Sequence, residues 1–519
     1  MESSFIGYTR GDYSSKSFQA VNPANGEKLP SHYAFASDED VNLACKLADQ
    51  ASLKLAALSG QEKAKFLKTL ANGIEGIVDD LVGVMTQETG LPELRVRGET
   101  GRTCAQLRMF AQLVEDGNWV DARIDREQPD RKPLPKPDLR SMLRPVGPVA
   151  VFCASNFPLA FSVAGGDSAS AWAAGCPVIV KAHHAHPGTA LLIGEKVVEC
   201  MQQCNWPEGA FSLLFGEGRK IGQALVSNSV IKAVGFTGSR SGGRALFDLA
   251  SKRPDPIPVF AEMSSVNPVF VLSTMKGVEM DQFAEGLAGS ANLGVGQFCT
   301  NPGIVFHPAG EWGEKFVEVY AEKMRVTKPC PMLHQGIKDA YETGLNSLAS
   351  CNGIDVIHRS TIYENDAGSA AGPAVLRTTT TSFLTDKSMM EEVFGPSTLL
   401  VGYDSIEELF EVSRILEGQL TISIFGDSSV LHEQESLLSE LEIKAGRLLF
   451  NQFPTGVEVC PSIVHGGPYP ATTDARSTSV GTGAILRFAR PVCYQGFPND
   501  FLPDELKEGN PLGLVRCEA

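Results

Sequence analysis

The feature that most constrains this fold is a regular alternation of short apolar runs with helical patterns between residues 145 and 250. Strands that alternate with helices of 10–15 residues form βαβ units on a parallel sheet. Sheets of this kind bind ligands, commonly nucleotides, at the carboxyl ends of their strands. The sequence therefore predicts an α/β fold with a nucleotide-type site. The expected order is strand 146–152, helix 162–174, strand 177–180, helix 188–204, strand 210–215, helix 219–227, strand 231–236 and helix 239–250.

Length and charge narrow the class of protein further. A chain of 519 residues predicts two to four domains. Hydrophobic residues make up 43% of it, which excludes disorder as the main state. Lys and Arg number 45 against 61 Asp and Glu, a net charge of −16, and no block of five or six basic residues occurs. These properties argue against a nucleic-acid partner.

Cysteine usage and hydropathy indicate the compartment. The twelve cysteines form no close paired framework and no CxxC motif, so a disulfide scaffold and a zinc ribbon are unsupported. The first residues, MESSFIGYTRGDYSSKSFQ, lack the apolar segment of a secretory signal. No uninterrupted apolar stretch of ~18 residues is present, so no membrane partner is expected. We expect reduced thiols and a cytoplasmic location.

One cysteine stands in a run suited to covalent chemistry. Cys299 lies in GVGQFCTNPG, residues 294–303, where glycines and small side chains leave space for a bulky electrophile. A thiolate is the most nucleophilic side chain at neutral pH. Free cysteines are also among the most buried residues, so a core thiol is the alternative that the glycine spacing alone leaves open.

Two polar residues follow apolar strand runs and are candidates for the same chemistry. Glu262, in FAEMSSVNP, is suited to act as a general base whose pKa is raised by burial. Asn156, in ASNFP, is suited to donate a hydrogen bond to a developing oxyanion. Their alternatives are a strand-end acid bonded to backbone amides and a simple helix-entry turn.

Three histidines, at positions 183, 184 and 186, follow Lys181 at the end of an expected strand. A zinc site is one interpretation, but the spacing does not suit one helix face and no cysteine or carboxylate is adjacent. A strand-end ligand loop in which Lys181 meets an anion is favoured. No metal is therefore predicted.

The run FTGSRSGG at 236–243 has the order strand, turn and helix. Ser239 fits an N-cap, and a helix N-terminus offers free amides to a phosphate. Taken singly this signal is weak. A P-loop and a GxSxG nucleophile elbow are both absent from the sequence, which lowers the P-loop NTPase and serine hydrolase interpretations.

In this order and spacing, the motifs resemble the aldehyde dehydrogenase superfamily from about residue 20 to about residue 500. In finer detail, the chain resembles a narrower branch of this superfamily through runs that include PKPDLR, FNQFPTGVEV and VHGGPYPATT. That branch contains 2,5-dioxovalerate (α-ketoglutaric semialdehyde) dehydrogenases and an NADP-preferring fatty aldehyde dehydrogenase of luminous bacteria. The motifs that carry the resemblance are SNFPLAF, VIVKAHHAHPGT, FTGS, EMSSVNP, GQFCTNPG and EEVFGP.

The resemblance implies an NAD(P)-dependent oxidation of an aldehyde to a carboxylic acid. Cys299 would attack the aldehyde, Asn156 would hold the oxyanion, and Glu262 would activate the water that hydrolyses the thioester. The expected substrate is 2,5-dioxopentanoate, oxidised to 2-oxoglutarate, and an aliphatic or long-chain fatty aldehyde is the alternative. A cysteine thioesterase and a non-catalytic structural protein on the same fold are alternatives of other classes.

The resemblance also implies the cofactor site. NAD-specific relatives usually carry Glu where this chain has His184, and Arg219 adds positive charge near the expected phosphate position. We therefore expect NADP to be preferred and NAD to be accepted with lower affinity. The ELGG that typically follows the base is replaced here by EMSS. The cofactor residues carried over are Lys181, His184, Arg219, Thr237, Gly238, Ser239, Gly243, Glu392 and Phe394.

Substrate residues and domains follow from the same resemblance. Arg102 and Arg108 would lie on the helix that lines the substrate entrance, although surface or interdomain ion pairs are their alternative role. Phe161, Phe298 and Phe453 would form an apolar wall. The expected domains are a Rossmann-like cofactor domain (1–118 and 144–262), an α/β catalytic domain (263–470) and an arm (119–143 and 471–519). The arm would mediate a homodimer or homotetramer.

Overall fold

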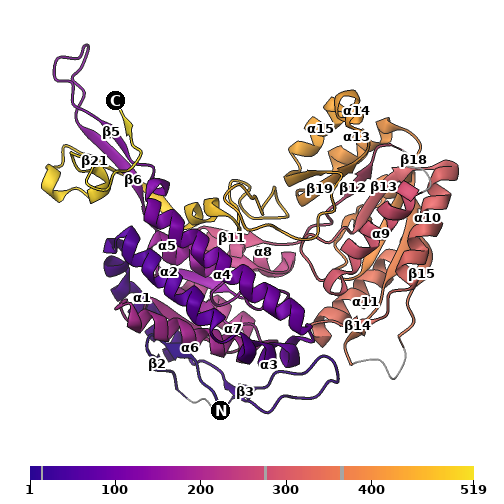
Figure 1. Cartoon of the computed structure of the whole chain (residues 1–519), viewed down its shortest axis with the longest axis horizontal. Coiled ribbons are helices and arrows are strands. Elements are labelled where there is room, and N and C mark those ends of the chain that lie inside the picture. Colours follow the sequence, from indigo (N-terminus) through magenta and orange to yellow (C-terminus); the bar gives the residue numbers. More distant parts are fainter. Residues whose placement is uncertain (13–15, 274–277, 363–367) are drawn as a thin grey trace.

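The computed structural model consists of two α/β lobes and a projecting β arm (Figure 1). It describes residues 1–12, 16–273, 278–362 and 368–519. The N-terminus lies beneath the first lobe, and the C-terminus lies on the arm. The α/β fold predicted from the sequence is confirmed.

The first lobe is built on a seven-stranded sheet in which five strands are parallel. The parallel strands are buried on both faces, as expected when helices cover a sheet on both sides. A short antiparallel hairpin from the N-terminus completes one edge. In spatial order the strands are β11 (Val259–Glu262), β10 (Ala233–Thr237), β7 (Val149–Phe152), β8 (Val178–Lys181), β9 (Phe211–Leu214), β1 (Phe5–Ile6) and β2 (Thr9–Arg10).

Helices cover both faces of this sheet. One core joins it to α2 (Gly60–Glu75), α4 (Glu93–Asp116), α5 (Gly166–Ala174) and α6 (Pro187–Gln203). The opposite core joins it to α1 (Asp38–Ala57), α7 (Gly218–Ser227) and α8 (Arg240–Ser251), while α3 (Val78–Thr89) packs on α4 and α6. Capping boxes begin α1 at Ser37 and α2 at Ser59, where each side chain satisfies an otherwise free backbone N–H.

The strand order reverses between β7 and β10. The chain runs from β7 outward to β8 and β9, then returns to the other side of β7 to form β10 and β11. The loops that leave β7 and β10 therefore diverge and open a crevice at their carboxyl ends. This switch point places the segments that follow Phe152 and Thr237 at the crevice.

The second lobe has a similar seven-stranded sheet, in which only the edge strand β15 is antiparallel. Two of its inner strands are buried along almost their whole length, as expected when helices cover both faces. In spatial order the strands are β15 (Asp355–Arg359), β17 (Ala374–Thr379), β18 (Ser397–Tyr403), β13 (Ile304–Pro308), β12 (Val269–Val271), β19 (Gln419–Phe425) and β20 (Ala445–Phe450).

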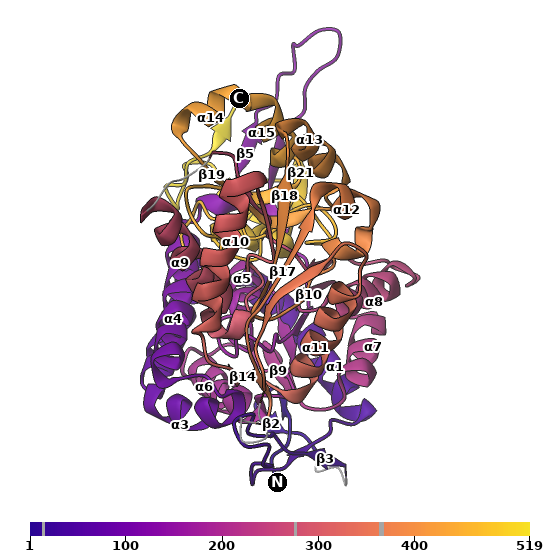
Figure 2. The same cartoon turned by 90° about the vertical axis from the view of Figure 1, so that its right-hand side faces the viewer.

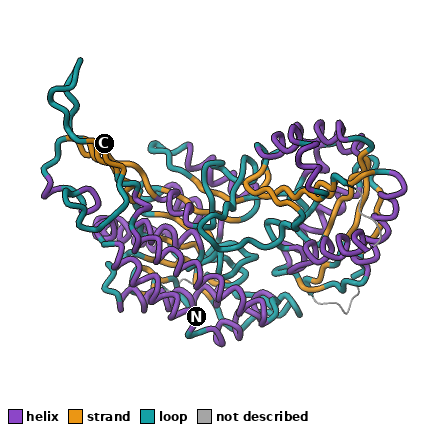
Figure 3. The backbone as a smooth tube through the Cα atoms, turned by 45° about the horizontal axis from the view of Figure 1, so that its top comes forward, coloured by secondary structure: helices purple, strands orange, loops and turns teal. Residues whose placement is uncertain are grey.

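The helices of the second lobe also lie on both faces (Figure 2). On one side are α9 (Val278–Asn292) and α10 (Gly310–Arg325). On the other are α11 (Gln335–Ala349), α12 (Thr380–Thr385), α13 (Ile406–Ile415) and α15 (Glu435–Glu442), and the short α14 (Ser428–Glu433) precedes α15. Figure 3 shows mostly loops in the region between the two lobes, where the site described below is located.

The arm is a four-stranded sheet of β21 (Ala489–Gln495), β6 (Leu139–Pro145), β5 (Arg123–Asp125) and β22 (Cys517–Glu518). Its C-terminal part begins at residue 489 rather than at the expected residue 471. The segment before it ends in a 3₁₀ helix, η4 (Thr482–Phe488), whose Ile485 and Phe488 are buried in the core of the first lobe. Burial of these apolar side chains holds residues 482–488 on the first lobe.

Smaller elements complete the chain. They are the pairs β3 (Ser17–Phe18) with β4 (Tyr33–Ala34) and β14 (Cys330–Pro331) with β16 (Ala370–Ala371), and the 3₁₀ helices η1 (Asn118–Val120), η2 (Leu293–Gly296), η3 (Lys387–Met390), η5 (Asn499–Phe501) and η6 (Asp504–Leu506). Within the described ranges, no helix has both the length and the apolar character needed to cross a bilayer.

Candidate active site

Cys299 follows a strained left-handed turn at the end of α9 and η2. Gly294, Val295 and Gly296 have φ angles of 58°, 59° and 66°. The left-handed conformation is costly for a β-branched residue such as Val295, and it persists only where the surroundings impose it. A side chain at Gly296 would place Cβ 2.3 Å from the carbonyl carbon of Gly395. The turn is therefore fixed against the loop that carries Glu392.

Asn267, in the segment that joins β11 to β12, holds the cysteine loop. Its side-chain amide donates to the backbone carbonyls of Cys299 (2.8 Å) and Asn301 (2.9 Å). The side-chain oxygen Oε1 of Gln419 in turn accepts from the backbone N–H of Asn267 and from the Ser265 hydroxyl. Ser265, one of the two serines that replace the usual glycines after Glu262, is thus part of the hydrogen-bond network that supports the nucleophile loop.

Glu262 ends strand β11 and is almost fully buried. Its Oε2 accepts a hydrogen bond from Ser479 (3.1 Å), and its Oε1 lies 3.0 Å from Nε2 of His465. The same Nε2 atom is 3.3 Å from Sγ of Cys299. Oε1 has no well-aligned donor in the described part of the chain, so it is available to accept a hydrogen bond from water. Glu262, His465 and Cys299 therefore form one contiguous group.

The pKa values of the two acidic groups, the Cys299 thiol and the Glu262 carboxyl, are shifted in opposite directions. Burial, and then the charges of Glu262 and Glu392, raise the pKa of the Cys299 thiol well above its ordinary value. Burial alone would also raise the pKa of Glu262, but its contacts with His465, Cys299 and Ser479 outweigh this and lower it. The resting state is accordingly a thiol beside a carboxylate, and a nucleophilic thiolate requires that its proton be taken by a neighbouring base.

Asn156 is next to the nucleophile, and its role as an oxyanion donor stays a prediction. Its side-chain nitrogen donates to the backbone carbonyl of Gln297 at 3.1 Å, two residues before Cys299. An amide nitrogen carries two hydrogens, so the second remains for another acceptor. Asn156 lines the same cavity as Cys299 and Glu262.

Aromatic side chains pack beside Cys299. Phe157 and Phe298 are in edge contact with ring centroids 5.3 Å apart, and Phe161 lies 6.1 Å from the His465 ring. Phe161 and Phe298 thus belong to one apolar cluster beside Cys299, and their role as a substrate wall stays a prediction. Phe453 instead packs on Phe283 and Phe425 in the core beneath α9. The structure gives no support to a wall position for Phe453.

The two arginines proposed for the substrate entrance lie in different environments. Arg102 is half-buried and donates to the carbonyl of Val457. Its Cζ atom lies 6.0 Å from the centroid of the Phe161 ring, at the outer limit of a cation–π contact. Arg108 is partly exposed, with 41% of its side chain accessible, and pairs with Glu75 at 2.6 Å. The surface ion pair, which was the alternative for Arg108, is what the structure shows. We therefore leave Arg108 out of the site.

A cavity of about 520 Å³ opens at the switch point of the first sheet and reaches the catalytic group. The segments after β7, β10 and β11 form one wall, and α11 with the Glu392 loop forms the other. Of the residues proposed for the cofactor, Thr237, Gly238, Ser239, Glu392 and Phe394 line it. The cavity also contains Cys299, Glu262 and Asn156.

The polar groups of this cavity fit a phosphorylated, ribose-bearing ligand. The buried hydroxyl of Thr237 has no hydrogen-bond partner in the described residues. Lys181, at the end of β8, is buried but is not part of the cavity lining. Burial lowers the pKa of Lys181 to about 8. Ser239 is the N-cap of α8 and accepts from Gly242 N–H. A Cβ at Gly243 would meet the Met263 side chain at 2.7 Å, so α8 packs closely against the strand end.

Glu392 faces the cavity from the second lobe. Burial raises its pKa to about 7, an effect that hydrogen bonds from Ser264 and Ser265 partly offset. The Ser265 N–H lies 3.5 Å from its Oε1. A carboxylate in this position is suited to accept hydrogen bonds from sugar hydroxyls.

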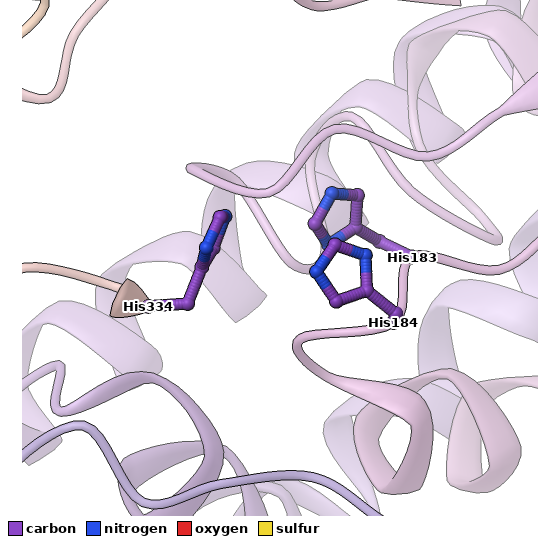
Figure 4. Close-up of side chains that lie close together, drawn as sticks. All are labelled: His183, His184 and His334. Carbon is purple, nitrogen blue, oxygen red and sulfur yellow. The ribbon is translucent and has the colours of Figure 1, made fainter. Parts of the chain in front are cut away.

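A histidine group borders the cavity (Figure 4). His183 and His184 come from the loop after β8, and His334 faces them from the start of α11, with one nitrogen of each within 4.8 Å of the others. His186 does not join them, because its Nε2 is 2.8 Å from the Ala154 carbonyl. The zinc set considered from the sequence is thus not assembled. Nδ1 of His183 already accepts from Ala185 N–H, and burial lowers the pKa of all three rings, that of His334 to about 4.

His184 and Arg219 lie outside the lining of this cavity. Both are exposed, His184 just after β8 and Arg219 in the first turn of α7. The Arg219 guanidinium has no ion-pair or hydrogen-bond partner among the residues that the structure describes, whereas the neighbouring Lys220 pairs with Asp38 at 3.2 Å. Arg219 is therefore free to contact an anion at the edge of the sheet.

Comparison with known proteins identifies the family of this chain. A profile described as "Aldehyde dehydrogenase family" matches residues 9–468. The chain belongs to the aldehyde dehydrogenase family. It is 47% identical over 504 residues to alpha-ketoglutaric semialdehyde dehydrogenase 2 of Azospirillum brasilense, covering 97% of this chain and 96% of that protein. It is 44% identical over 513 residues to the alpha-ketoglutaric semialdehyde dehydrogenase of Acinetobacter baylyi, covering 99% and 97%.

Solved structures share the fold of this aldehyde dehydrogenase. Lactaldehyde dehydrogenase from Escherichia coli superposes with a TM-score of 0.82 at 21% identity, covering 95% of this chain and 98% of that one. PnpE, solved in complex with nicotinamide adenine dinucleotide, gives a TM-score of 0.80 at 21% identity, covering 95% and 97%. The family, the fold and the oxidoreductase class predicted from the sequence are confirmed.

Sequence reasoning missed two groups that contact the catalytic centre of this aldehyde dehydrogenase. His465 lies 166 residues after Cys299 in the irregular tail, and the only local signal was its place in the run VHGGP. Asn267 was part of the quoted EMSSVNP run but received no role. Its left-handed backbone, with φ of 45°, marks it as a constrained position that only the structure reveals.

Proposed function

We propose that this aldehyde dehydrogenase oxidises 2,5-dioxopentanoate to 2-oxoglutarate and that it uses NADP in preference to NAD. The observation that carries the reaction is the contact of the Cys299 sulfur with the His465–Glu262 pair, inside the cavity that the switch point opens. The substrate is supported by two relatives named for α-ketoglutaric semialdehyde, each aligned over nearly the whole chain.

The first step is attack of the Cys299 sulfur on the aldehyde carbon. The thiol proton passes to His465 or Glu262, because the pKa of the thiol is too high for spontaneous ionisation. The carbonyl oxygen becomes the oxyanion of a thiohemiacetal, and the free hydrogen of the Asn156 amide is placed to stabilise it. A nicotinamide held in this cavity would supply the hydride acceptor needed to convert this species into a thioester.

Hydrolysis of the thioester is assigned to Glu262. Its pKa is lowered, so it is a carboxylate at neutral pH, and its Oε1 has no well-aligned protein donor in the described residues. Glu262 takes a proton from water as the water attacks the thioester carbon, and the thiolate leaves and regains a proton. The product is a carboxylic acid.

The residues that would hold the cofactor are those with unsatisfied or exposed polar groups around the cavity. Lys181 and Thr237 offer a buried ammonium and a buried hydroxyl, and the first turn of α8 offers backbone amides to the pyrophosphate. Glu392 would accept from the nicotinamide ribose, and Phe394 would pack against the ring.

The preference for NADP is supported by charge at the edge of the sheet. Position 184 carries an imidazole where a carboxylate would repel a 2′-phosphate, and the Arg219 guanidinium has no acidic partner among the described residues. A guanidinium matches phosphate oxygens in a bidentate geometry. Together these features favour the 2′-phosphate.

Assembly and location are also proposals. Large apolar side chains are exposed on the arm and its neighbouring tail, which supports a homodimer or homotetramer formed through the arm. A cytoplasmic location stays a prediction from the sequence. The exposed arm and tail residues are Leu134, Phe497, Phe501, Leu512 and Val515.

The proposed function is tested by measuring reduced-cofactor formation with 2,5-dioxopentanoate and with decanal, each with NADP and with NAD. We expect the highest kcat/KM for 2,5-dioxopentanoate with NADP, and loss of at least about 99% of the rate in Cys299→Ala with cofactor binding retained. A higher kcat/KM for decanal would support the fatty aldehyde alternative. Hydrolysis of a thioester, without reduction of either cofactor when an aldehyde is added, would support a thioesterase.

A further inference from the structure

Two half-buried arginines, one from each lobe, are attached to the same loop beside the catalytic centre. Arg102 of α4 donates from Nη1 to the carbonyl of Val457 at 2.5 Å. Arg447 of β20 donates from Nη2 to the carbonyls of Pro454 (2.8 Å) and Gly456 (3.2 Å). Residues 454–457 thus bring the two guanidinium groups together across the gap between the lobes.

The loop that holds both guanidinium groups lies beside Cys299, because the Thr455 hydroxyl is 3.5 Å from the backbone carbonyl of Thr300. The charge of Arg102 opposes the rise in the pKa of the Cys299 thiol, and a Cys299 thiolate would favour the charged form of Arg447. Arg102 also lies over Phe157, at 5.9 Å from its ring centre, and Phe157 packs on Phe298, the residue before Cys299. The arginines therefore border the aromatic side of the nucleophile, where the substrate must enter.

Neither arginine is paired directly with a carboxylate of the described residues, although the charges of Glu99 and Glu458 favour the charged form of Arg102. Within the described ranges no carboxylate forms an ion pair with Arg102 or Arg447, although neighbouring Arg95 pairs with Glu99 at 3.4 Å. The Nε–H groups of Arg102 and Arg447 are both buried and lack any acceptor among the described residues. Burying unpaired charge and unsatisfied donors is costly, so retained cations of this kind are expected to meet an anion that the protein itself does not supply.

We infer that Arg102 and Arg447 form the subsite for the distal carboxylate of a short aldehyde acid. This inference rests on the proposed function and extends it to the substrate class. In 2,5-dioxopentanoate four carbon–carbon bonds separate the aldehyde from the carboxylate, a span of about 5 Å. With the aldehyde carbon at the Cys299 sulfur, the carboxylate reaches groups within electrostatic range of that sulfur. A long apolar aldehyde would bury both charges without compensation.

The test compares three five- or four-carbon aldehydes in wild type and in Arg447→Met, Arg102→Met and the double variant. Methionine preserves much of the apolar stem and removes the charge. For 2,5-dioxopentanoate and succinate semialdehyde we expect kcat/KM to fall about 10- to 100-fold in each single variant, the range of one charge-assisted contact. For uncharged pentanal we expect less than about a threefold change. Arg447→Lys is expected to recover part of the loss.

A binding measurement separates recognition from catalysis. Calorimetric titration with 2-oxoglutarate, the proposed product, should show weaker binding in both methionine variants by a similar factor. Arg97→Met is the matched control, because Arg97 lies on the same helix α4 but is exposed and paired with Asp79 and Glu93. The control should behave as wild type in every assay.

The outcomes distinguish this inference from the proposed function. A wild-type enzyme that oxidises pentanal as well as 2,5-dioxopentanoate would contradict the proposed substrate. A wild-type enzyme that prefers 2,5-dioxopentanoate, with methionine variants that keep this preference, would overturn only the arginine subsite. An equal loss with pentanal and with the charged substrates would also overturn it, by showing that the arginines serve to hold the 454–457 loop.

Discussion

The Nε2 atom of His465 lies 3.3 Å from the sulfur of Cys299. The same nitrogen is 3.0 Å from a carboxylate oxygen of Glu262, so a single imidazole nitrogen faces both the nucleophile and the proposed base of the hydrolytic step. Because the pKa of the thiol is raised, this nitrogen gives the thiol proton a short path into the His465–Glu262 pair.

We expect His465→Ala to slow the attack of the cysteine. Removing a positioned proton acceptor typically costs about 10²- to 10⁴-fold, so kcat/KM for aldehyde should fall at least about 100-fold. The rate of Cys299 alkylation by iodoacetamide at neutral pH should fall in parallel. His432→Ala, an exposed change on α14, is the control and should leave both rates unchanged. An alkylation rate equal to that of wild type would show that His465 does not assist deprotonation.

Glu262→Gln should make the thiol more acidic. The Glu262 carboxylate raises the pKa of Cys299, so removing its charge lowers that pKa, and the pH profile of alkylation should move toward lower pH. In the same variant thioester hydrolysis should slow by about 10²- to 10⁴-fold. A rapid burst of reduced cofactor should therefore precede slow turnover. A missing burst, or a profile displaced to higher pH, would contradict the assignment.

Arg219→Ala should weaken NADP selectively. A charge-assisted hydrogen bond contributes roughly 1.5–3 kcal/mol, which corresponds to about a 10- to 150-fold change in affinity. We expect the KM for NADP to rise at least tenfold and that for NAD to change little. Lys220→Ala, the adjacent cation that already pairs with Asp38, is the comparison. Equal weakening of both cofactors would mean that Arg219 supports the loop and does not contact the phosphate.

Binding of NAD should strengthen as pH rises through about 7. The pKa of Glu392 is raised to about 7 by burial, so the side chain is neutral below this value and a carboxylate above it. Only the carboxylate accepts hydrogen bonds from both ribose hydroxyls. Dissociation constants from fluorescence titration below pH 8, where Lys181 keeps most of its charge, should decrease with pH in wild type and stay flat in Glu392→Gln. NAD is used because the 2′-phosphate of NADP would itself titrate in this range.

Gly296→Ala should destabilise the protein. The new Cβ would lie 2.3–2.5 Å from backbone atoms of Gly395 and Pro396, and φ at this position is 66°. Such overlap and strain cost roughly 1–3 kcal/mol in the free energy of unfolding. Gly289→Ala in α9 is the control, because a Cβ there meets nothing within 4 Å. Urea denaturation should show it to be neutral or stabilising by up to about 1 kcal/mol.

Local pattern was sufficient to predict much of the cofactor lobe. The expected strand at 177–180 and helix at 188–204 correspond to β8 (Val178–Lys181) and α6 (Pro187–Gln203), and Ser239 is the N-cap that its sequence suggested. These features depend on periodicity and capping between neighbouring residues. The boundary of the arm was misplaced because burial of Ile485 and Phe488 depends on the first lobe, which is far away in the sequence.

The sequence by itself determined the βαβ architecture, the candidate roles of Cys299, Glu262 and Asn156, and, through resemblance, the family. Only the tertiary structure decided which other side chains lie beside these three residues and which do not. It brought His465 to Cys299 across 166 residues, joined Arg102 and Arg447 through one loop, and placed Arg108 in a surface ion pair. The physical reason is that strands and helices follow from local periodicity, whereas proximity, burial and charge compensation arise only when distant segments pack together.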